Sequence, residues 1–260
     1  MEKLTIKNRK GQNIVVLVEK AENQKGLAFI MHGLGGFKEQ PHIQTIAETF
    51  RENGYTVVRF DSTNTLGESD GNYEEATITN YYEDLEDVIK WAETQEWYQE
   101  PFALAGHSLG GISVALFAEN YSEKVKAVAP ISTVVSGKLS MEARERYKPK
   151  ELKKWRETGW QEGKSRARPG VIKRLPWSHM EDLMKYDLLL KVDKLTMSVL
   201  LIVGEQDEST PLDHQKILYQ ALPGPKELHI IKDAPHTFRD PGHLEEIKKI
   251  FGNWLKNSKI

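Results

Sequence analysis

The chain has 260 residues, enough for one large domain or two small ones, so length alone does not decide the number of domains. Its 39% hydrophobic and 28% charged residues are typical of a globular protein, and a net charge of -2 gives no reason to expect nucleic acid or an anionic membrane as a partner. The absence of cysteine excludes disulfides, thiolate metal sites and a cysteine nucleophile.

The first ten residues, MEKLTIKNRK, contain no apolar run like the core of a signal peptide. No later stretch approaches the ~20 apolar residues that a membrane span needs. We therefore expect a cytoplasmic protein that does not bind a membrane.

Short apolar runs alternate with helix-length amphipathic segments along the chain. Two runs that flank a turn-like Asn-Arg-Lys-Gly predict an opening hairpin, at residues 4–6 and 14–18. Six further strands are predicted at residues 27–31, 55–60, 102–105, 125–131, 199–203 and 228–231. Most of these runs are apolar throughout, which is typical of strands covered on both faces in a parallel sheet.

Helices are predicted between these strands, at residues 43–52, 79–94, 109–120, 212–221 and 244–255. The alternation of strands and helices predicts an α/β fold with right-handed crossovers. Residues 135–188 break this alternation, because they lack a strong strand signal and are too long for a loop of a compact domain. We interpret them as a helical lid inserted into a core made of residues 1–134 and 189–260.

The predicted lid is rich in basic residues and carries Trp155, Trp160 and Trp177. The stretch from Lys138 to Arg174 contains thirteen basic and five acidic residues. The plain interpretation is a set of solvated helix faces. The alternative is a positive rim that attracts anionic substrates, with the tryptophans as flat walls for an aromatic or acyl group.

The pattern G-x-S-x-G occurs twice, around Ser108 and around Ser69. Only Ser108 follows an apolar strand directly and precedes a small-residue helix, which is the strand–turn–helix context of a nucleophile elbow. The flanking Gly106 and Gly110 suit a turn too tight for side chains. We therefore predict Ser108 as the nucleophile and interpret Ser69 as part of a turn near the site rim.

A serine needs a base, and in this arrangement an acid and then a histidine follow it in the chain. Asp207 comes after the strand at residues 199–203, with Glu208 as the alternative acid, and His236 follows the last strand. The carboxyl ends of parallel strands gather such groups at one edge. The other histidines on helices or in the lid are interpreted as structural or solvated: His42, His179, His214 and His243. His229, inside a strand, is interpreted as packed.

An oxyanion hole requires two backbone N–H groups that point at one spot. Leu109 should supply one, and the glycine-rich loop after the strand at residues 27–31 should supply the other, from Leu34 or alternatively Gly33. His32 is interpreted as a structural residue that supports this loop. No zinc, Walker or dinucleotide motif is present, so no metal or cofactor is expected.

Together, the H-G loop, G-H-S-L-G-G, G-E-Q-D-E-S-T-P and D-A-P-H-T-F resemble the α/β-hydrolase superfamily across nearly the whole chain. The chain is most similar to small bacterial esterases of feruloyl or cinnamoyl type and to serine-aminopeptidase-like hydrolases. The resemblance implies a mostly parallel, eight-stranded sheet flanked by helices. It also implies Ser108, Asp207 and His236 as a catalytic triad, with Leu34 and Leu109 as oxyanion donors.

The activity expected from this resemblance is hydrolysis of small carboxylic esters, with a short-chain or aromatic acyl group, through an acyl-enzyme. Amides or peptides, thioesters and carbon–carbon bonds are alternative substrates for the same triad. A small-molecule receptor on the same fold is the alternative without catalysis. The expected partner is the ester substrate alone, and the expected assembly is a monomer or homodimer.

Overall fold

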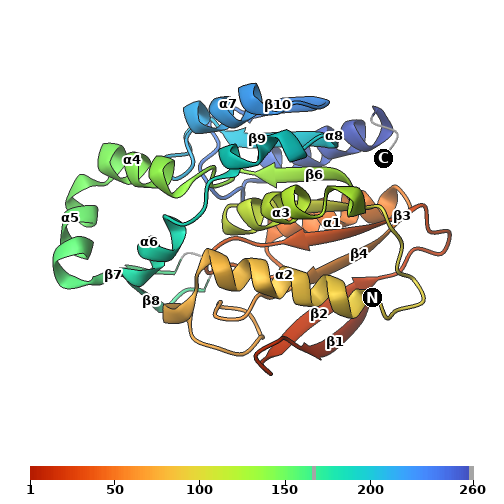
Figure 1. Cartoon of the computed structure of the whole chain (residues 1–260), viewed down its shortest axis with the longest axis horizontal. Coiled ribbons are helices and arrows are strands. Elements are labelled where there is room, and N and C mark those ends of the chain that lie inside the picture. The colour runs from red at the N-terminus through yellow and green to blue at the C-terminus, as the bar shows by residue number, and fades with distance from the viewer. Residues whose placement is uncertain (166–167, 258–260) are drawn as a thin grey trace.

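Eight strands form one sheet in a computed structural model of the chain, which describes residues 1–165 and 168–257 (Figure 1). Their order across the sheet is β1-β2-β4-β3-β5-β6-β9-β10. The strands are β1 (Glu2–Lys7), β2 (Asn13–Glu19), β3 (Gly26–Met31), β4 (Tyr55–Phe60), β5 (Phe102–His107), β6 (Val125–Ile131), β9 (Ser198–Gly204) and β10 (Lys226–Ile231). Only β2 runs antiparallel to its neighbours, and the remaining pairs are parallel. The predicted hairpin and the mostly parallel sheet are confirmed.

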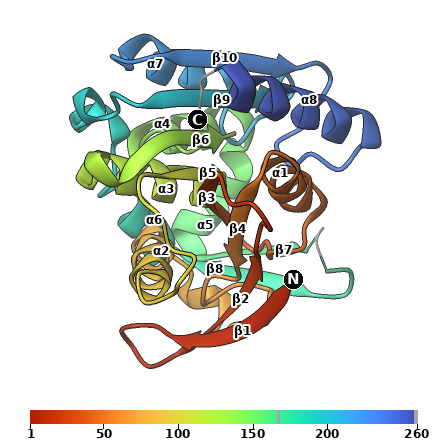
Figure 2. The same ribbon diagram turned by 90° about the vertical axis from the view of Figure 1, so that its right-hand side faces the viewer.

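Helices cover both faces of this sheet, which explains why its central strands are apolar throughout. The helices are α1 (Pro41–Glu52), α2 (Ile78–Ala92), α3 (Leu109–Asn120), α7 (Leu212–Ala221) and α8 (Pro241–Asn257). Successive side chains of a strand point to opposite faces, so Phe29 packs in the cluster with α2 and α3 and Ile30 in the cluster with α1 and α8. Figure 2 shows the two helix layers on either side of the sheet.

The helix ends follow local sequence signals. Pro41 occupies the first turn of α1, where its missing N–H removes no hydrogen bond, and the helix stops before Gly54, which has φ +90. The side chain of Thr77 accepts a hydrogen bond from the Asn80 N–H and caps α2. Four short 3-10 helices complete the connections, at Tyr73–Glu75, Ser122–Lys124, Leu188–Leu190 and Val192–Lys194.

The segment 135–188, called the inserted segment below, contains helices and a hairpin. Its helices are α4 (Gly137–Tyr147), α5 (Pro149–Thr158) and α6 (Ser178–Leu183). Between α5 and α6, β7 (Trp160–Lys164) pairs antiparallel with β8 (Ile172–Pro176). The segment was predicted to be helical; its helices are present, and the hairpin between them was not predicted.

The hairpin escaped prediction because Leu175 is its one buried side chain in the described strands, so neither strand has an apolar face. Most residues of β7 and β8 are exposed or half-buried, so neither strand carries the apolar run by which the other strands were found. Side chains on the hairpin surface hold it instead. Arg174 pairs with Glu162 at 2.9 Å, and its guanidinium lies 4.3 Å from the ring centre of Trp160.

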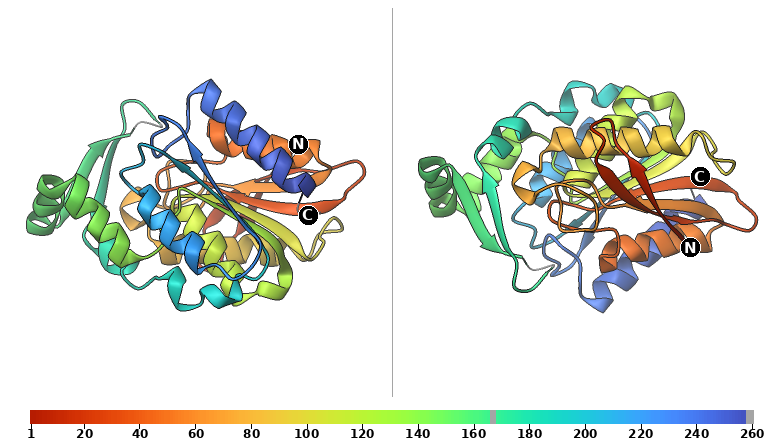
Figure 3. Two further views of the ribbon diagram at one scale, coloured as in Figure 1. Left: turned by 90° about the horizontal axis from the view of Figure 1, so that it is seen from above. Right: turned by 90° about the horizontal axis from the view of Figure 1, so that it is seen from below.

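The inserted segment packs against the core at one end of the molecule, as both views in Figure 3 show. Trp155, Leu175 and Met180 belong to the same hydrophobic cluster as α2 and α3. Asp182 of α6 accepts hydrogen bonds from the hydroxyl and the N–H of Thr79 in α2, at 2.6 and 3.1 Å. A continuous apolar cluster and buried polar contacts therefore join the segment to the core.

Within the described ranges, no helix combines the length and the apolar character needed to cross a membrane.

Glu119 is a buried acid near the end of α3. Glu119 is 5% exposed, and its Oε1 has no hydrogen-bond partner in the described part of the chain. Burial raises the pKa of this carboxyl to about 8, an effect that Lys191 opposes and that Asp187 and Asp193 reinforce. The folded chain therefore holds this proton more tightly than the unfolded chain, where a glutamate titrates near ~4.3.

We expect this difference to make the wild-type free energy of unfolding fall as the pH rises from about 4.5 to about 8, because the folded state then binds more protons than the unfolded state. Glu119→Gln should match the wild type at pH 4 and exceed it at pH 9 by a few kcal/mol, since each unit of pKa shift corresponds to about 1.4 kcal/mol. Urea unfolding across this pH range measures the effect. Glu123→Gln, at an exposed position, is the control. Parallel pH curves for wild type and Glu119→Gln would contradict this prediction.

Candidate active site

Ser108 sits in the tight turn between β5 and α3, with the left-handed φ of 57. A Cβ on Gly106 would lie 2.2 Å from the carbonyl oxygen of Gly110, and a Cβ on Gly110 would lie 2.5 Å from that of His32. Real Cβ atoms do not approach backbone this closely, so both positions require glycine. The Ser108 N–H donates to the Ile131 carbonyl at 2.9 Å and fixes the turn against β6.

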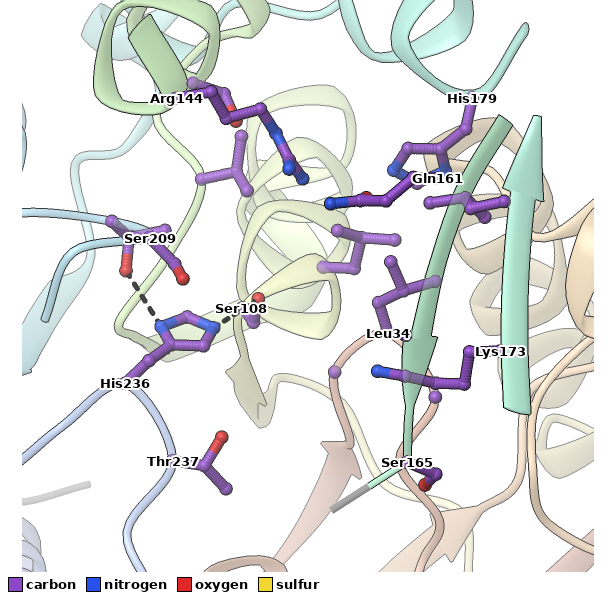
Figure 4. Close-up of a pocket in the computed structure, with 18 of the residues that line it drawn as sticks. Leu34, Ser108, Arg144, Gln161, Ser165, Lys173, His179, Ser209, His236 and Thr237 are labelled. Carbon is purple, nitrogen blue, oxygen red and sulfur yellow. Dashed lines mark hydrogen bonds between the residues drawn. The ribbon is translucent and has the colours of Figure 1, made fainter. Parts of the chain in front are cut away.

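The three residues predicted to act together meet at the carboxyl edge of the sheet. His236 Nε2 lies 3.0 Å from Ser108 Oγ, and His236 Nδ1 lies 2.8 Å from Asp207 Oδ2 (Figure 4 shows the bond to Ser108). An ionised carboxylate can only accept, so Nδ1 carries the proton and Nε2 is left as an acceptor for the serine hydroxyl. The arrangement can therefore pass the serine proton to His236.

Asp207 is held as a carboxylate by its surroundings. Its side chain is fully buried, and it also accepts hydrogen bonds from the N–H groups of Ser209 and Thr210 and from the Thr210 hydroxyl, all at 2.8–2.9 Å. Burial alone would raise its pKa. The charge and hydrogen bond of His236 and the bonds from Thr210 outweigh burial and hold the pKa of Asp207 well below its usual range.

The alternative acid lies apart from this arrangement. Glu208 is exposed and does not line the cavity beside Ser108. Its neighbour Glu205 is also exposed and accepts the N–H of Asp233 at 3.0 Å. Only Asp207 of these three contacts His236.

The loop after β3 brings Gly33 and Leu34 to the same cavity as Ser108 and Leu109. Neither the Leu34 nor the Leu109 backbone N–H has an acceptor within the described residues. The Ser62 N–H donates to His32 Nε2 at 3.1 Å, so the neutral ring carries its proton on Nδ1 and donates to the Gly33 carbonyl at 2.8 Å. Burial lowers the pKa of His32, which keeps the ring neutral.

His107 is a positioning residue that sequence reasoning missed. Its Nε2 donates to the carbonyl oxygen of His236 at 2.8 Å, and its ring packs 4.9 Å from that of His236 and 4.6 Å from that of His42. Burial lowers the pKa of His107 to about 3, so the ring stays neutral beside His236. In the motif it occupies a variable position, and no sequence signal distinguished it.

Ser69 has a structural place. Its hydroxyl donates to the Asp61 carbonyl at 2.6 Å and accepts the Val15 N–H at 2.8 Å. It does not line the cavity beside Ser108. The hydroxyl thus both donates and accepts a hydrogen bond, and the two bonds hold the loop after β4 against β2.

A cavity of about 460 Å³ lies between the sheet edge and the inserted segment. In Figure 4, Ser108 and His236 lie to one side, above Thr237, while Arg144 reaches in from α4 above them. Gln161 of β7 and His179 of α6 lie opposite Arg144. Volumes of this order are typical of small-molecule sites.

The three tryptophans of the inserted segment do not line this cavity, so the expectation that they form its walls was wrong. Trp155 is 1% exposed, with its ring 5.5 Å from that of Trp177 and 6.3 Å from that of His179. Trp160 supports the hairpin surface. These large rings pack the inserted segment together instead.

The basic residues divide between the cavity and the outer surface. Four of the thirteen line the cavity, namely Arg144, Lys148, Lys164 and Lys173, and Arg239 of the core joins them. The acidic residues among the lining are Glu151 and Glu162. Arg166 lies outside the described residues. The cavity wall in the described ranges therefore carries more positive than negative groups.

The remaining histidines have structural surroundings. His42 and His214 are buried, and His243 is half-buried. His229 was expected to be packed, but β10 is an edge strand and the ring is part-exposed beside Glu227, 2.8 Å away. His179, expected to be structural or solvated, is buried and lines the cavity.

Comparison with known proteins gives one family and several similar structures. The sequence matches the family described as serine aminopeptidase, S33, over residues 22–240. An uncharacterized 31.7 kDa protein of Escherichia coli is 25% identical, and the match covers 88% of this chain and 90% of the relative.

Among solved structures, Est1E from Butyrivibrio proteoclasticus with ferulic acid bound has a TM-score of 0.81 at 23% identity, covering 98% of this chain and 99% of that one. Mouse alpha/beta hydrolase domain-containing protein 10 has a TM-score of 0.79 at 19% identity, with the same coverage of each chain. The fold is the α/β-hydrolase fold, and the resemblance carried by the motifs is confirmed.

The turn around Ser108 yields a prediction about stability. In Gly106→Ala the added methyl group would meet the Gly110 carbonyl oxygen at 2.2 Å, so the turn must open. We expect the free energy of unfolding to fall by about 1–3 kcal/mol, as for other overpacked sites. Gly252→Ala in α8 is the matched control, because nothing lies within 4 Å of its added carbon. It should leave stability equal or raise it by up to ~1 kcal/mol. Urea denaturation compares them, and equal losses in both variants would refute this account of the turn.

Proposed function

The chain belongs to the serine aminopeptidase S33 family of hydrolases, and from this premise we propose that it hydrolyses carboxylic esters with Ser108 as nucleophile, His236 as base and Asp207 as the acid that orients it. The observation that carries the proposal is the hydrogen-bonded series Asp207–His236–Ser108, at 2.8 and 3.0 Å, beside a cavity. This is the geometry that converts a serine hydroxyl into a nucleophile.

The reaction begins when Ser108 Oγ attacks the ester carbonyl carbon and its proton moves to His236 Nε2. The N–H groups of Leu34 and Leu109 stabilise the oxyanion, with Gly33 as the alternative to Leu34. The tetrahedral intermediate then collapses: the bond to the alcohol oxygen breaks, and His236 gives that oxygen its proton. Water next attacks the acyl-enzyme and loses a proton to His236. A second collapse releases the carboxylic acid and restores the Ser108 hydroxyl.

Esters of small acids are the substrates that the cavity supports best. Its volume of about 460 Å³ accommodates a short-chain or aromatic acyl group. The similar Est1E structure binds ferulic acid, an aromatic acid. An aminopeptidase must hold the ammonium group of a peptide N-terminus, and the excess of basic residues in this wall disfavours a cation.

Two serines with the same local motif give a matched test. Ser108→Ala should reduce kcat for 4-nitrophenyl butyrate by about 10⁴–10⁶, as other triad deletions do. Ser69→Ala should retain most of the activity, because its hydroxyl only bonds backbone groups of Asp61 and Val15. Release of 4-nitrophenol measures both variants, and unchanged melting temperatures confirm folding. A dead Ser69→Ala beside an active Ser108→Ala would overturn the assignment.

A substrate panel tests the bond that is cleaved. We expect the highest kcat/KM for the ester among an ester, a thioester and an arylamide that share one acyl group. The described wall carries more basic than acidic side chains, which disfavours a peptide amine. Faster cleavage of the arylamide would favour the peptidase alternative, and activity limited to the thioester would favour a thioesterase.

A further inference from the structure

Arg144 is a cation that lines the cavity and forms no ion pair within the described part of the chain. It lies on α4, half-buried, and its side chain extends from the helix into the cavity that holds Ser108 (Figure 4). No carboxylate of the described residues comes within 4.0 Å of its guanidinium to form an ion pair. A half-buried guanidinium gives up part of its hydration, and no ion pair among the described residues compensates for that loss.

Three other arginines of the inserted segment, Arg146, Arg156 and Arg174, do have acidic partners. Arg146, two residues further along on the exposed side of α4, pairs with Asp213 at 2.7 Å. Arg174 pairs with Glu162 at 2.9 Å. These exposed arginines are paired with acids, whereas Arg144 at the cavity wall has no ion pair within the described residues.

The groups around Arg144 orient its guanidinium but do not neutralise it. The guanidinium lies 5.1 Å from the ring centre of Trp155, a stacking that holds it in place. Glu151 and Tyr73 favour the charged form without an ion pair, and burial lowers the pKa of Arg144. His179 donates its Nδ1–H to the Ala76 carbonyl at 2.8 Å, and an imidazole ring carries no negative charge in any case.

The other side chains that line the cavity indicate the chemical character of the middle of a substrate. The cavity is also lined by apolar side chains, namely Leu34, Leu109, Val134, Leu175 and Leu183. In Figure 4, Arg144 lies above the Ser108–His236 pair and is set apart from it. A ligand that reaches both therefore has a reactive carbonyl, an apolar middle and an anionic end.

We propose that Arg144 binds a carboxylate at the end of the substrate remote from the scissile ester, which makes half-esters and other carboxylate-bearing esters the substrate class. The inference rests on the proposed function for its chemistry. A planar guanidinium donates two parallel hydrogen bonds to a carboxylate, which is the geometry that favours this anion. The substrate carboxylate then forms the ion pair that the Arg144 guanidinium lacks within the described residues.

The test compares substrates that differ only in this group. One pair is the mono-4-nitrophenyl ester of adipic acid and its terminal carboxamide, with the charge on the acyl side. The other is 4-acetoxybenzoate and 4-acetoxybenzamide, with the charge on the leaving group. We expect the wild type to show about 10- to 100-fold higher kcat/KM for the carboxylate in one pair, the range that charge-assisted hydrogen bonds provide.

Arg144→Gln should bring the carboxylate-to-amide ratio of that pair close to one, and Arg144→Lys should restore part of the preference. Arg146→Gln is the matched control, because it removes the same charge from the same helix outside the cavity. It should keep the wild-type ratio. A carboxylate-to-amide ratio near one for both pairs in the wild type would overturn the inference. An equal loss in Arg146→Gln would overturn it in favour of general attraction by the basic segment, which 1 M salt also removes.

Binding separates this inference from the proposed function. If the wild type cleaves none of the four esters, the proposed function fails, but the Ser108→Ala protein can still be titrated calorimetrically with the adipate half-ester and its carboxamide. We expect about 10-fold tighter binding of the carboxylate, lost in the Ser108→Ala/Arg144→Gln protein. Equal affinities for the two compounds would reject the role of Arg144 independently of any catalysis.

Discussion

The backbone conformation of Ser108 is the constraint on which the rest of the site depends. A serine at φ 57 costs free energy, on the order of 1–3 kcal/mol, and persists only where the surroundings determine it fully. Here the Gly106 and Gly110 positions let α3 approach β5 and the loop after β3 so closely that no side chain fits. The hydroxyl is consequently held clear of the backbone, at the start of α3 and facing His236.

Parallel pairing then brings the partners to this hydroxyl. The strands β3, β5, β9 and β10 all run the same way, so the loops that follow them meet at one edge. His236 thereby becomes a neighbour of Ser108, 128 positions before it in the chain, and of Asp207, 29 positions before it. Buried neutral histidines support the loops from behind: His32 bonds the Gly33 carbonyl, and His107 bonds that of His236. Burial keeps both rings uncharged, so they fix geometry without repelling a protonated His236.

The core and the inserted segment contribute different things to the cavity. The core supplies the groups proposed to react, on loops fixed by the sheet. The inserted segment supplies the opposite wall, with Arg144 on a helix and Gln161 and Lys173 on the hairpin. The reacting groups of the core can stay the same while changes in the inserted segment alter which substrates bind, because function depends on the site and not on the architecture. The unpaired guanidinium is therefore informative about substrate in a way that the shared fold is not.

The sequence by itself determined the sheet, the turn at Ser108 and the choice among its candidate partners. Continuous apolar runs mark strands buried on both faces, and chain order with loop position selects Asp207 and His236. Only the tertiary structure decided the hairpin β7–β8, whose polar strands carry no periodic burial signal, and the packing of Trp155 away from the cavity. It alone also distinguished Arg144 from Arg146. Both are arginines on one short helix, and whether such a charge faces an acid, water or a cavity depends on contacts between segments distant in the chain.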